Sequence, residues 1–297
     1  MPWTNASIVL NSRDATRGSY NNLAFNAEGQ NIIQGQVDSI AVSEVNFPYD
    51  IPNIQGVTSG FVLQELANPT NLVPITVPTG FYTGPELEAA ITAAIAATTI
   101  GTEVECHYDA ISNRFDFTTN AAPWILQSSY TFPPGYTLTT NRGSLGKDIL
   151  SLMGYAYPGS SPLISNAVPF LPGAPSSGSA PLVFTQYIDI CSPQLCKFQY
   201  FRDGTTTNLA RRSDVICRLY IANNVATQEE EGTRPFLIHR QYKNARVMRW
   251  TADNSVGTID IQLYDDTGQP LATEWAPRPY QVTFNCYELS AEEGLGR

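Results

Sequence analysis

The stretch Thr258-Ile-Asp-Ile-Gln-Leu-Tyr264 alternates apolar and polar residues, and Tyr280-Gln-Val-Thr-Phe-Asn-Cys-Tyr-Glu288 does the same. Side chains along a β-strand point alternately to opposite faces, so each stretch has one buried face and one that contacts water. Between the two, Asp265-Asp-Thr-Gly268 predicts a turn, because Gly268 tolerates a positive φ. The residues expected to face the core are Ile259, Ile261 and Leu263 in the first stretch, and Tyr280, Val282, Phe284 and Cys286 in the second.

The composition is typical of a sheet-rich protein with many turns. Only 15% of the 297 residues are charged, Gly and Pro number 21 each, and 11% are aromatic, which argues against a helical bundle and against a disordered chain. The net charge of −10 argues against general nucleic-acid binding, which requires a basic surface. Two local basic groups remain, and both are expected to be solvent-exposed loop and strand residues: Arg211-Arg212, and the set Arg240, Lys243, Arg246 and Arg249.

Membrane and redox signals are weak. No segment approaches the ~18 consecutive apolar residues of a membrane span, and the N-terminal Met-Pro-Trp-Thr lacks the pattern of a secretory signal.

The chain has five cysteines at scattered spacings. Cys217 and Cys286 are expected to face the core as small apolar groups. Cys191 and Cys196 flank a short turn and could form a disulfide, but unpaired thiols are favoured because nothing else indicates an oxidising compartment.

The strands expected along the chain are short. Val37–Phe47 reads as a strand whose apolar parity switches near Ser43-Glu44, which predicts a β-bulge. The two prolines in Phe47–Asn53 are expected to end it. Two hairpins are predicted, one from Phe61–Leu66 and Leu72–Val77, the other from Glu103–Asp109 and Arg114–Thr119. Further strands are predicted at Leu182–Ile190, Val215–Ile221, Phe236–His239, Ala245–Trp250, Val256–Tyr264 and Gln281–Glu288.

One clear helix interrupts this pattern. Thr83 or Gly84 can cap it, Pro85 suits its first turn, and Gly101 ends it. Leu87, Ile91 and Ile95 recur every fourth residue and form one buried stripe. A second, short helix is predicted over Lys147–Met153.

The predicted fold class is mostly β, a single jelly-roll β-sandwich with a helix-hairpin insertion. Residues 1–35 are expected to form an N-terminal arm or edge strand, and 36–288 the sandwich. Within the sandwich, 79–155 is a candidate inserted subdomain and 157–182 a loop rich in Pro, Gly and Ser. Residues 289–297 form a polar tail.

No catalytic, cofactor or metal site is predicted. His107 and His239 lack the spacing of a metal site, and GxSxG, GxGxxG and GxxxxGK[ST] are all missing. Asp265-Asp266 is the most obvious carboxylate pair for a glycosidase or a calcium ion, but adjacent acids at a turn tip usually face water. Asp109 and Asp116, which flank a hairpin, are equally ordinary. The chain is therefore predicted not to be an enzyme.

Aromatic residues are concentrated near the end of the chain: Tyr264, Trp250, Trp275, Tyr280 and Tyr287. Most are expected to pack in the core. Tyr287 has the outward parity of the last strand, and aromatic side chains anchor interfaces. Tyr287 and Trp3, which lies in the N-terminal arm, are therefore the candidate interface residues.

Several blocks together resemble the minor capsid (penton) proteins of virophages and Polinton-like viruses, over about residues 37 to 288. They are Val42-Ser-Glu-Val-Asn-Phe-Pro-Tyr-Asp-Ile-Pro-Asn-Ile54, Ile75-Thr-Val-Pro-Thr-Gly-Phe-Tyr-Thr-Gly-Pro-Glu-Leu-Glu-Ala-Ala90, Gln186-Tyr-Ile-Asp-Ile-Cys-Ser-Pro-Gln-Leu195, Ile216-Cys-Arg-Leu-Tyr-Ile221 and Ile259-Asp-Ile-Gln-Leu-Tyr-Asp-Asp266. The resemblance implies a jelly-roll subunit of a homopentamer at the fivefold vertices of an icosahedral double-stranded DNA virus, beside a major capsid protein with a double jelly roll. It supplies no catalytic motif, and 157–182 matches no part of the pattern.

The function predicted from the sequence is therefore a structural capsid protein located in the virion and assembled in the host cell cytoplasm. Its acidic balance argues against a direct role with nucleic acid. One alternative is a receptor- or carbohydrate-binding module on a virion surface. Another is a glycoside hydrolase, which would need two carboxylates roughly 5–10 Å apart.

Overall fold

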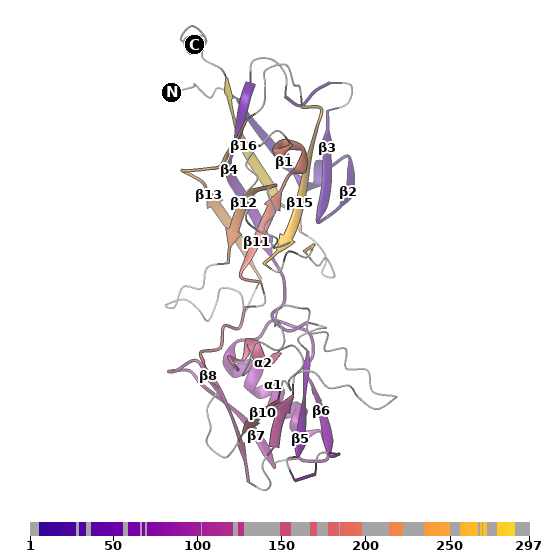
Figure 1. Ribbon diagram of the computed structural model, residues 1–297, viewed down its shortest axis with the longest axis vertical. Helices are drawn as coiled ribbons and strands as arrows, with labels where there is room; N and C mark the ends of the chain where they lie inside the picture. Colours follow the sequence, from indigo (N-terminus) through magenta and orange to yellow (C-terminus); the bar gives the residue numbers. More distant parts are fainter. Residues whose placement is uncertain are drawn as a thin grey trace, which may run out of the picture. The chain divides into compact units, whose positions relative to one another are not determined.

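A computed structural model of the chain divides into two compact units (Figure 1). The first comprises Met1–Asp50, Thr185–Ala222 and Phe236–Arg297, and the second comprises Ile51–Phe184 and Asn223–Pro235. The residues that the structure describes are 6–27, 30–33, 37–55, 59–65, 67–68, 70–101, 103–120, 124–127, 149–155, 167–170, 178–183, 185–197, 214–221, 235–249, 256–266, 268, 270–271 and 278–288.

Two antiparallel sheets build the first unit. One has the order β1 (Ala6–Asn11), β16 (Gln281–Glu288), β4 (Val37–Tyr49), β13 (Phe236–Gln241), with β14 (Val247–Arg249) also paired to β4. The other has the order β12 (Val215–Tyr220), β11 (Tyr187–Cys191), β15 (Thr258–Asp265), β3 (Asn22–Asn26), β2 (Arg17–Ser19). In the described part of this unit there are also two short helices, η1 (Ser12–Asp14) and α3 (Pro193–Cys196).

The pairing of these strands defines the topology. β1 pairs with β16, β3 with β15, β4 with β13, and β11 with β12. The first strand thus pairs with the last, and each later pair lies inside the previous one, as in a long ribbon folded at its middle. Successive pairs alternate between the two sheets, which is the eight-stranded jelly roll. The chain is mostly β, with a single jelly-roll sandwich and a small helical insertion, as the sequence predicted.

The alternation at the end of the chain is confirmed. Ile259, Ile261 and Leu263 on β15 are fully buried, whereas the residues between them are only partly buried. On β16 the buried residues are Tyr280, which directly precedes the strand, Val282, Phe284 and Cys286. Burial of each large apolar side chain stabilises the fold by about 1.5–3 kcal/mol, and this fixes which face of each strand points inward.

The β-bulge in β4 lies where the parity switch predicted it. Thr283 of β16 pairs with Glu44 and Phe284 pairs with Val42, so Ser43 is the additional residue. On the other side of β4 the pairing is interrupted at the same place, because residues 242–246 leave the sheet between β13 and β14. The Ser43 carbonyl accepts a hydrogen bond from Tyr242 N at 2.9 Å.

The prediction that Pro48 ends β4 is wrong. The strand continues to Tyr49, and Pro48 lies opposite Leu237 of β13. β16 pairs with β4 only as far as Asn46, so Pro48 has a neighbouring strand on one side alone. A proline is tolerated there because a strand with one free side does not need every amide donor.

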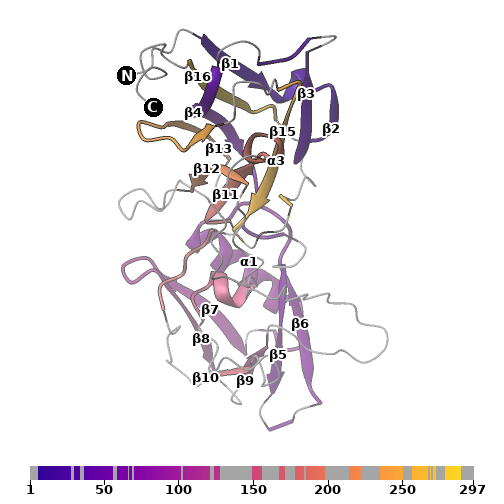
Figure 2. The same cartoon turned by 45° about the horizontal axis from the view of Figure 1, so that its top comes forward.

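In its described residues, the second unit combines a four-stranded sheet, a hairpin and two helices (Figures 1 and 2). The sheet has the order β10 (Ala167–Phe170), β9 (Trp124–Gln127), β5 (Gly60–Glu65), β6 (Leu72–Thr76). The hairpin consists of β7 (Val104–Asp109) and β8 (Arg114–Thr119), and the helices are α1 (Gly84–Ala96) and α2 (Ile149–Leu152). Both predicted hairpins and both predicted helices are therefore present.

Helix α1 begins as its sequence dictates. Thr83 N donates to Glu86 Oε2 at 2.9 Å, and Pro85 occupies the first turn, where no intrahelical donor is needed. Leu87, Ile91 and Ile95 are fully buried and share a core with residues of both β structures. This stripe makes the helix part of the second unit's own hydrophobic core.

Within 157–182, expected to be a loop, the structure describes a strand: β10 pairs with β9 at the edge of the sheet. Its Pro169 is acceptable because β10 is an edge strand. The expected insertion at 79–155 lies inside the second unit, which already begins at Ile51 because β5 and β6 contribute to the same core. In the expected arm, β1 and β2 are edge strands, whereas β3 lies inside its sheet, a role that the sequence did not predict.

Candidate interface on one flank of the jelly roll

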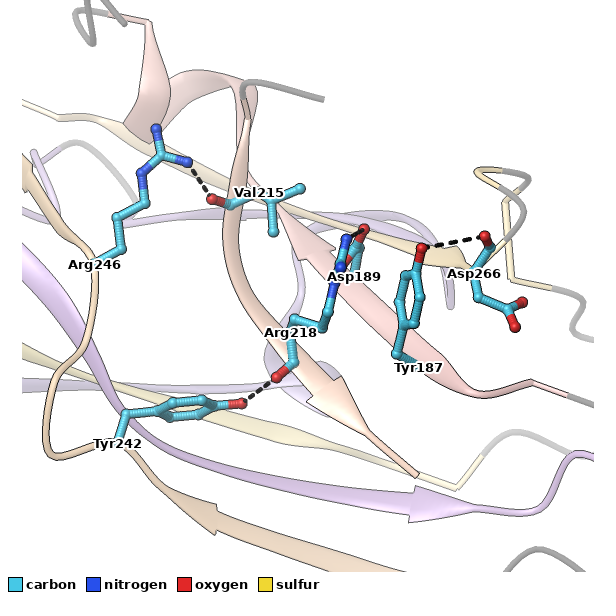
Figure 3. Close-up of polar contacts among 7 residues, drawn as sticks. All are labelled: Tyr187, Asp189, Val215, Arg218, Tyr242, Arg246 and Asp266. Carbon is cyan, nitrogen blue, oxygen red and sulfur yellow. Dashed lines mark hydrogen bonds and ion pairs between the residues drawn. The ribbon is translucent and has the colours of Figure 1, made fainter. Parts of the chain in front are cut away.

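One flank of the jelly roll contains an edge strand from each sheet. β12 ends one sheet and β13 ends the other, and the 242–246 turn joins them (Figure 3). We refer to β11, β12, β13, β14 and the 242–246 turn together as the β12–β13 flank. Edge strands carry main-chain N–H and C=O groups that other chains can pair with, so the β12–β13 flank is a candidate interface.

The 242–246 turn is held to β12 by two hydrogen bonds to main-chain carbonyls. Tyr242 Oη donates to Arg218 O at 3.0 Å, and Arg246 Nη1 donates to Val215 O at 2.6 Å (Figure 3). Burial raises the pKa of Tyr242, and the neighbouring Cys217 raises it further. The phenol therefore remains protonated and able to donate throughout the ordinary pH range.

An ion pair joins β11 to β12. Arg218 Nε lies 2.6 Å from Asp189 Oδ1, and Arg218 Nη2 lies 2.9 Å from Asp189 Oδ2. The side chain of Asp189 is only 10% exposed, whereas that of Arg218 is 35% exposed. The two residues lie directly opposite in the strand register, which makes the two-point contact possible. Hydrogen bonding to Asp189 raises the pKa of Arg218, so the guanidinium is permanently charged.

Two tyrosines lie beside this pair on the same face of the sheet. The guanidinium of Arg218 lies 3.8 Å from the centroid of the Tyr187 ring, a cation–π contact. Tyr187 lies opposite Tyr220, with ring centroids 6.1 Å apart. Tyr187 Oη donates to the Asp266 carbonyl at 3.3 Å, whereas the Tyr220 side chain is 61% exposed. The flank thus presents an aromatic ring to solvent beside a fixed charged pair.

The predicted basic set also belongs to the flank. Arg240 lies on β13, Lys243 and Arg246 lie in the turn, and Arg249 lies on β14; all four are exposed, as the sequence predicted. The Arg211-Arg212 pair lies outside the described residues.

The two interface candidates from the sequence have different outcomes. Trp3 lies outside the described residues. Tyr287 is partly buried near the end of β16, opposite Ser39, on the face that points away from the core residues Phe284 and Cys286. Its outward orientation agrees with its parity, while its role in an interface stays a prediction.

The residues considered for catalysis or metal binding are dispersed. His107 lies 3.5 Å from Glu105, and His239 Nδ1 lies 2.6 Å from Asn46 Oδ1. Asp266 Oδ2 accepts a hydrogen bond from Gln186 N at 3.0 Å, so this carboxylate holds the turn to β11. Over the described residues, no three His, Cys, Asp or Glu side chains form a group able to hold a metal ion. None of the helices described is long and apolar enough to cross a membrane.

The five cysteines are free thiols, and Cys191 and Cys196 are not joined by a disulfide. Cys217 lies opposite Ile190 on the inward face of β12, and Cys286 is buried on β16. Burial raises the pKa of Cys217 to about 12 and that of Cys196 to about 11. These groups therefore act as small apolar side chains and not as nucleophiles.

The sequence did not point to the Asp189–Arg218 pair. Both residues interrupt apolar runs in predicted strands, and a charged residue within a strand that is otherwise buried is a usable signal. The signal was incomplete because strand register, which places the two residues opposite each other, depends on the tertiary structure.

Comparisons with known proteins agree with the jelly-roll topology. The sequence matches no protein-family model and no curated protein. The structure is similar to a solved mavirus penton protein, with a TM-score of 0.51 and 12% identity, covering 96% of this chain and 100% of that chain. A chain in the cryo-EM structure of the Sputnik virophage matches with a TM-score of 0.38 and 12% identity, covering 95% of this chain and 98% of that chain. The chain therefore shares its fold with a virophage penton protein over nearly its whole length.

Proposed function

We propose that the chain is a minor capsid protein that forms homopentamers at the fivefold vertices of an icosahedral double-stranded DNA virus. The observation that carries the proposal is the full-length likeness to the mavirus penton protein, which extends through both units. Such a protein acts by shape and interface complementarity and without catalytic turnover. In the proposed virion it contacts a major capsid protein with a double jelly roll, after assembly in the host cell cytoplasm.

A ring requires a heterologous interface, in which one surface of a subunit contacts a different surface of its neighbour. Exposed aromatic side chains are the best anchors for such a contact, because they bury a large area with little loss of conformational freedom. Tyr220 on the β12–β13 flank is 61% exposed, and Tyr287 lies on the outer face of the other sheet. We infer that at least one of them lies in the subunit contact.

The decisive experiment is the solution mass of the purified chain, measured by light scattering after size exclusion with and without reductant. The proposal expects a pentamer of the 32.5 kDa chain that is insensitive to reductant, since all five thiols are free. Ring-shaped particles in electron micrographs would support the same conclusion. A stable assembly of another size would contradict it, and so would a monomer that adds to no vertex of reconstituted shells.

Variants can then locate the contact. Tyr220→Ser and Tyr287→Ser are compared with Ile111→Ser, a control at the tip of the β7–β8 hairpin, where the side chain is 98% exposed. Loss of the pentamer in either tyrosine variant, with the control intact, identifies that surface as the subunit contact. A pentamer retained in both would contradict the inference about these two anchors, while leaving the vertex proposal standing.

A carbohydrate-binding module is the second candidate, favoured by one observation. Tyr220 is exposed next to Tyr187 and the Arg218–Asp189 pair, an aromatic and charged surface suited to a sugar ring. Binding of a glycan from an array, lost in Tyr220→Ala with the pentamer unaffected, would support it.

A further inference from the structure

We propose that the outer edge of β13 binds an extended, acidic segment of a second polypeptide, which adds to the sheet as a further strand. The proposal does not depend on the vertex role. In the part of the chain that the structure describes, β13 pairs with β4 alone. Alternate residues of such a strand direct their main-chain N–H and C=O groups outward, where an incoming strand can pair with them.

The side chains of β13 favour an occupant that is partly apolar. Ile238 is buried, whereas its neighbour Leu237 is 66% exposed and offers an apolar contact at the edge of the sheet. His239 and Gln241 share the parity of Leu237 and are also exposed. An added strand would cover Leu237 with an apolar residue of its own, since facing side chains of paired strands lie roughly 4.5–5.5 Å apart.

The charge of the segment favours an acidic occupant. From Pro235 to Arg249 the sequence contains four Lys or Arg residues and no acid, although the whole chain carries a net charge of −10. Arg240 and Lys243 are exposed at the end of β13 and in the adjoining turn. The neighbouring acid is Glu44 of β4, which lies 3.6 Å from His239 Nδ1. Carboxylates of an added strand would therefore find Arg240 and Lys243 within a locally basic region.

A peptide fits these features better than a nucleic acid. The free edge supplies hydrogen bonds at the spacing of a β-strand, and Leu237 supplies an apolar contact that a phosphate backbone cannot use. The overall negative charge also opposes binding of a long polyanion. β13 has 6 residues and so accommodates a segment of about the same length.

The test uses the full-length protein and a short fluorescein-labelled peptide in which valine and glutamate alternate, with binding followed by fluorescence anisotropy at low salt. The expected result is binding of this peptide and none of its lysine-for-glutamate counterpart. Two further peptides carry N-methyl groups on either alternate set of residues. One set is expected to weaken binding at least about tenfold and the other to leave it unchanged, because only alternate amides of an added strand face its partner.

Charge-reversal variants test the site. Arg240→Glu combined with Lys243→Glu is expected to weaken binding of the acidic peptide at least about tenfold. The matched control, Arg13→Glu combined with Arg17→Glu, reverses two exposed cations, one in η1 and one on β2, and is expected to retain affinity.

Several results would overturn the proposal. They are absence of binding by the acidic peptide, equal binding of both N-methylated peptides, and tighter binding of duplex DNA than of the peptide under the same conditions. Conversion of an oligomer to a monomer by the Arg240 and Lys243 variants would show that a second copy of the chain occupies the edge, and would also overturn it. The N-methyl series needs no variant, so it remains decisive even if the charge reversals impair folding.

Discussion

The phenol of Tyr242 donates a hydrogen bond to the main-chain carbonyl of Arg218 at 3.0 Å, and so links the edge strands of the two jelly-roll sheets. Tyr242 follows β13, and its own amide donates to Ser43 in the bulge of β4. The residue therefore connects the irregularity in one sheet with the edge strand of the other. The 242–246 turn leaves the sheet opposite the bulge, which places this tyrosine beside β12.

Removal of the Tyr242 hydroxyl should measurably destabilise the jelly roll. We expect Tyr242→Phe to lower the free energy of unfolding by about 0.5–1.5 kcal/mol, the usual net value of one hydrogen bond. The measurement is urea unfolding followed by tryptophan fluorescence. Tyr264→Phe is the control, because its hydroxyl donates a hydrogen bond to the Gln262 side chain, two residues earlier on the same strand. Equal effects of the two variants would contradict a special role for Tyr242.

The Arg218–Asp189 pair should show strong coupling. Arg218→Met leaves the carboxylate of Asp189, which is only 10% exposed, without its cation. We expect a loss of on the order of 1–3 kcal/mol, moderated because Arg218 is partly solvated. Adding Asp189→Leu to Arg218→Met should restore part of the loss, because no buried charge then remains unpaired. Additive effects in urea unfolding would argue that the two side chains stabilise the fold independently.

The stability of the protein should depend on pH through the ionisation of Asp50. Burial raises the pKa of Asp50 above its ordinary value of 3.8, and Arg278 only partly offsets this. Because the pKa of Asp50 is higher in the folded state, its contribution to the free energy of unfolding is fully present below pH 3.8. That contribution is lost as the pH rises through the pKa of the folded state. Asp50→Asn should therefore stabilise the protein at about pH 7 and have little effect at about pH 3.

The pKa of Asp109 is shifted in the opposite direction, so its effect on stability should depend on pH in the opposite way. Hydrogen bonds from the Ser112 hydroxyl, at 2.6 Å, and from Ile111 N lower the pKa of Asp109. The contribution of Asp109 to stability is present at pH values above its unfolded-state pKa. It is lost as the pH falls through its folded-state pKa. Asp109→Asn should therefore be unfavourable at neutral pH and nearly neutral in acid. Parallel pH profiles for the Asp50 and Asp109 variants would refute at least one of the two assignments.

The buried thiols should react slowly until the protein unfolds. Burial raises the pKa of Cys217 to about 12, so at about pH 8 only about one molecule in ten thousand carries the thiolate. We expect a thiol-specific disulfide reagent to modify the native chain far more slowly than the denatured chain, which should release five equivalents. Rapid modification of Cys191 and Cys196 in the native state would contradict their burial.

The second unit should respond separately to a change in its own core. Phe117 is fully buried, and its ring centroid lies 5.8 Å from that of Phe61 and 6.2 Å from that of Tyr155. Phe117→Ala should cost about 3–5 kcal/mol. Differential scanning calorimetry is expected to show that one transition moves down while another, belonging to the jelly roll, stays in place. The control is Phe284→Ala in β16, which should shift the other transition. A single shared transition for both variants would show that the two cores unfold together.

Local patterns were enough to predict several elements. The alternation around Ile261 and Phe284 predicted β15 and β16, and the spacing of Leu87, Ile91 and Ile95 predicted helix α1, because a single repeated contact face dominates each segment. Predictions that relied on proline, or on a stretch rich in Pro, Gly and Ser, were less accurate. Pro48 and Pro169 both lie within strands, because each strand has a free side there. Whether a strand has a free side is decided by its neighbours in space.

The sequence by itself determined the mostly β fold class, the inward faces of β15 and β16, and the bulge at Ser43. These properties depend on the period and type of neighbouring side chains, which any short segment already contains. Only the tertiary structure decided which strands pair, and hence that Asp189 faces Arg218 and that Tyr242 reaches β12. Those contacts join residues distant in the chain, so they exist only once the ribbon of strands has rolled into two sheets.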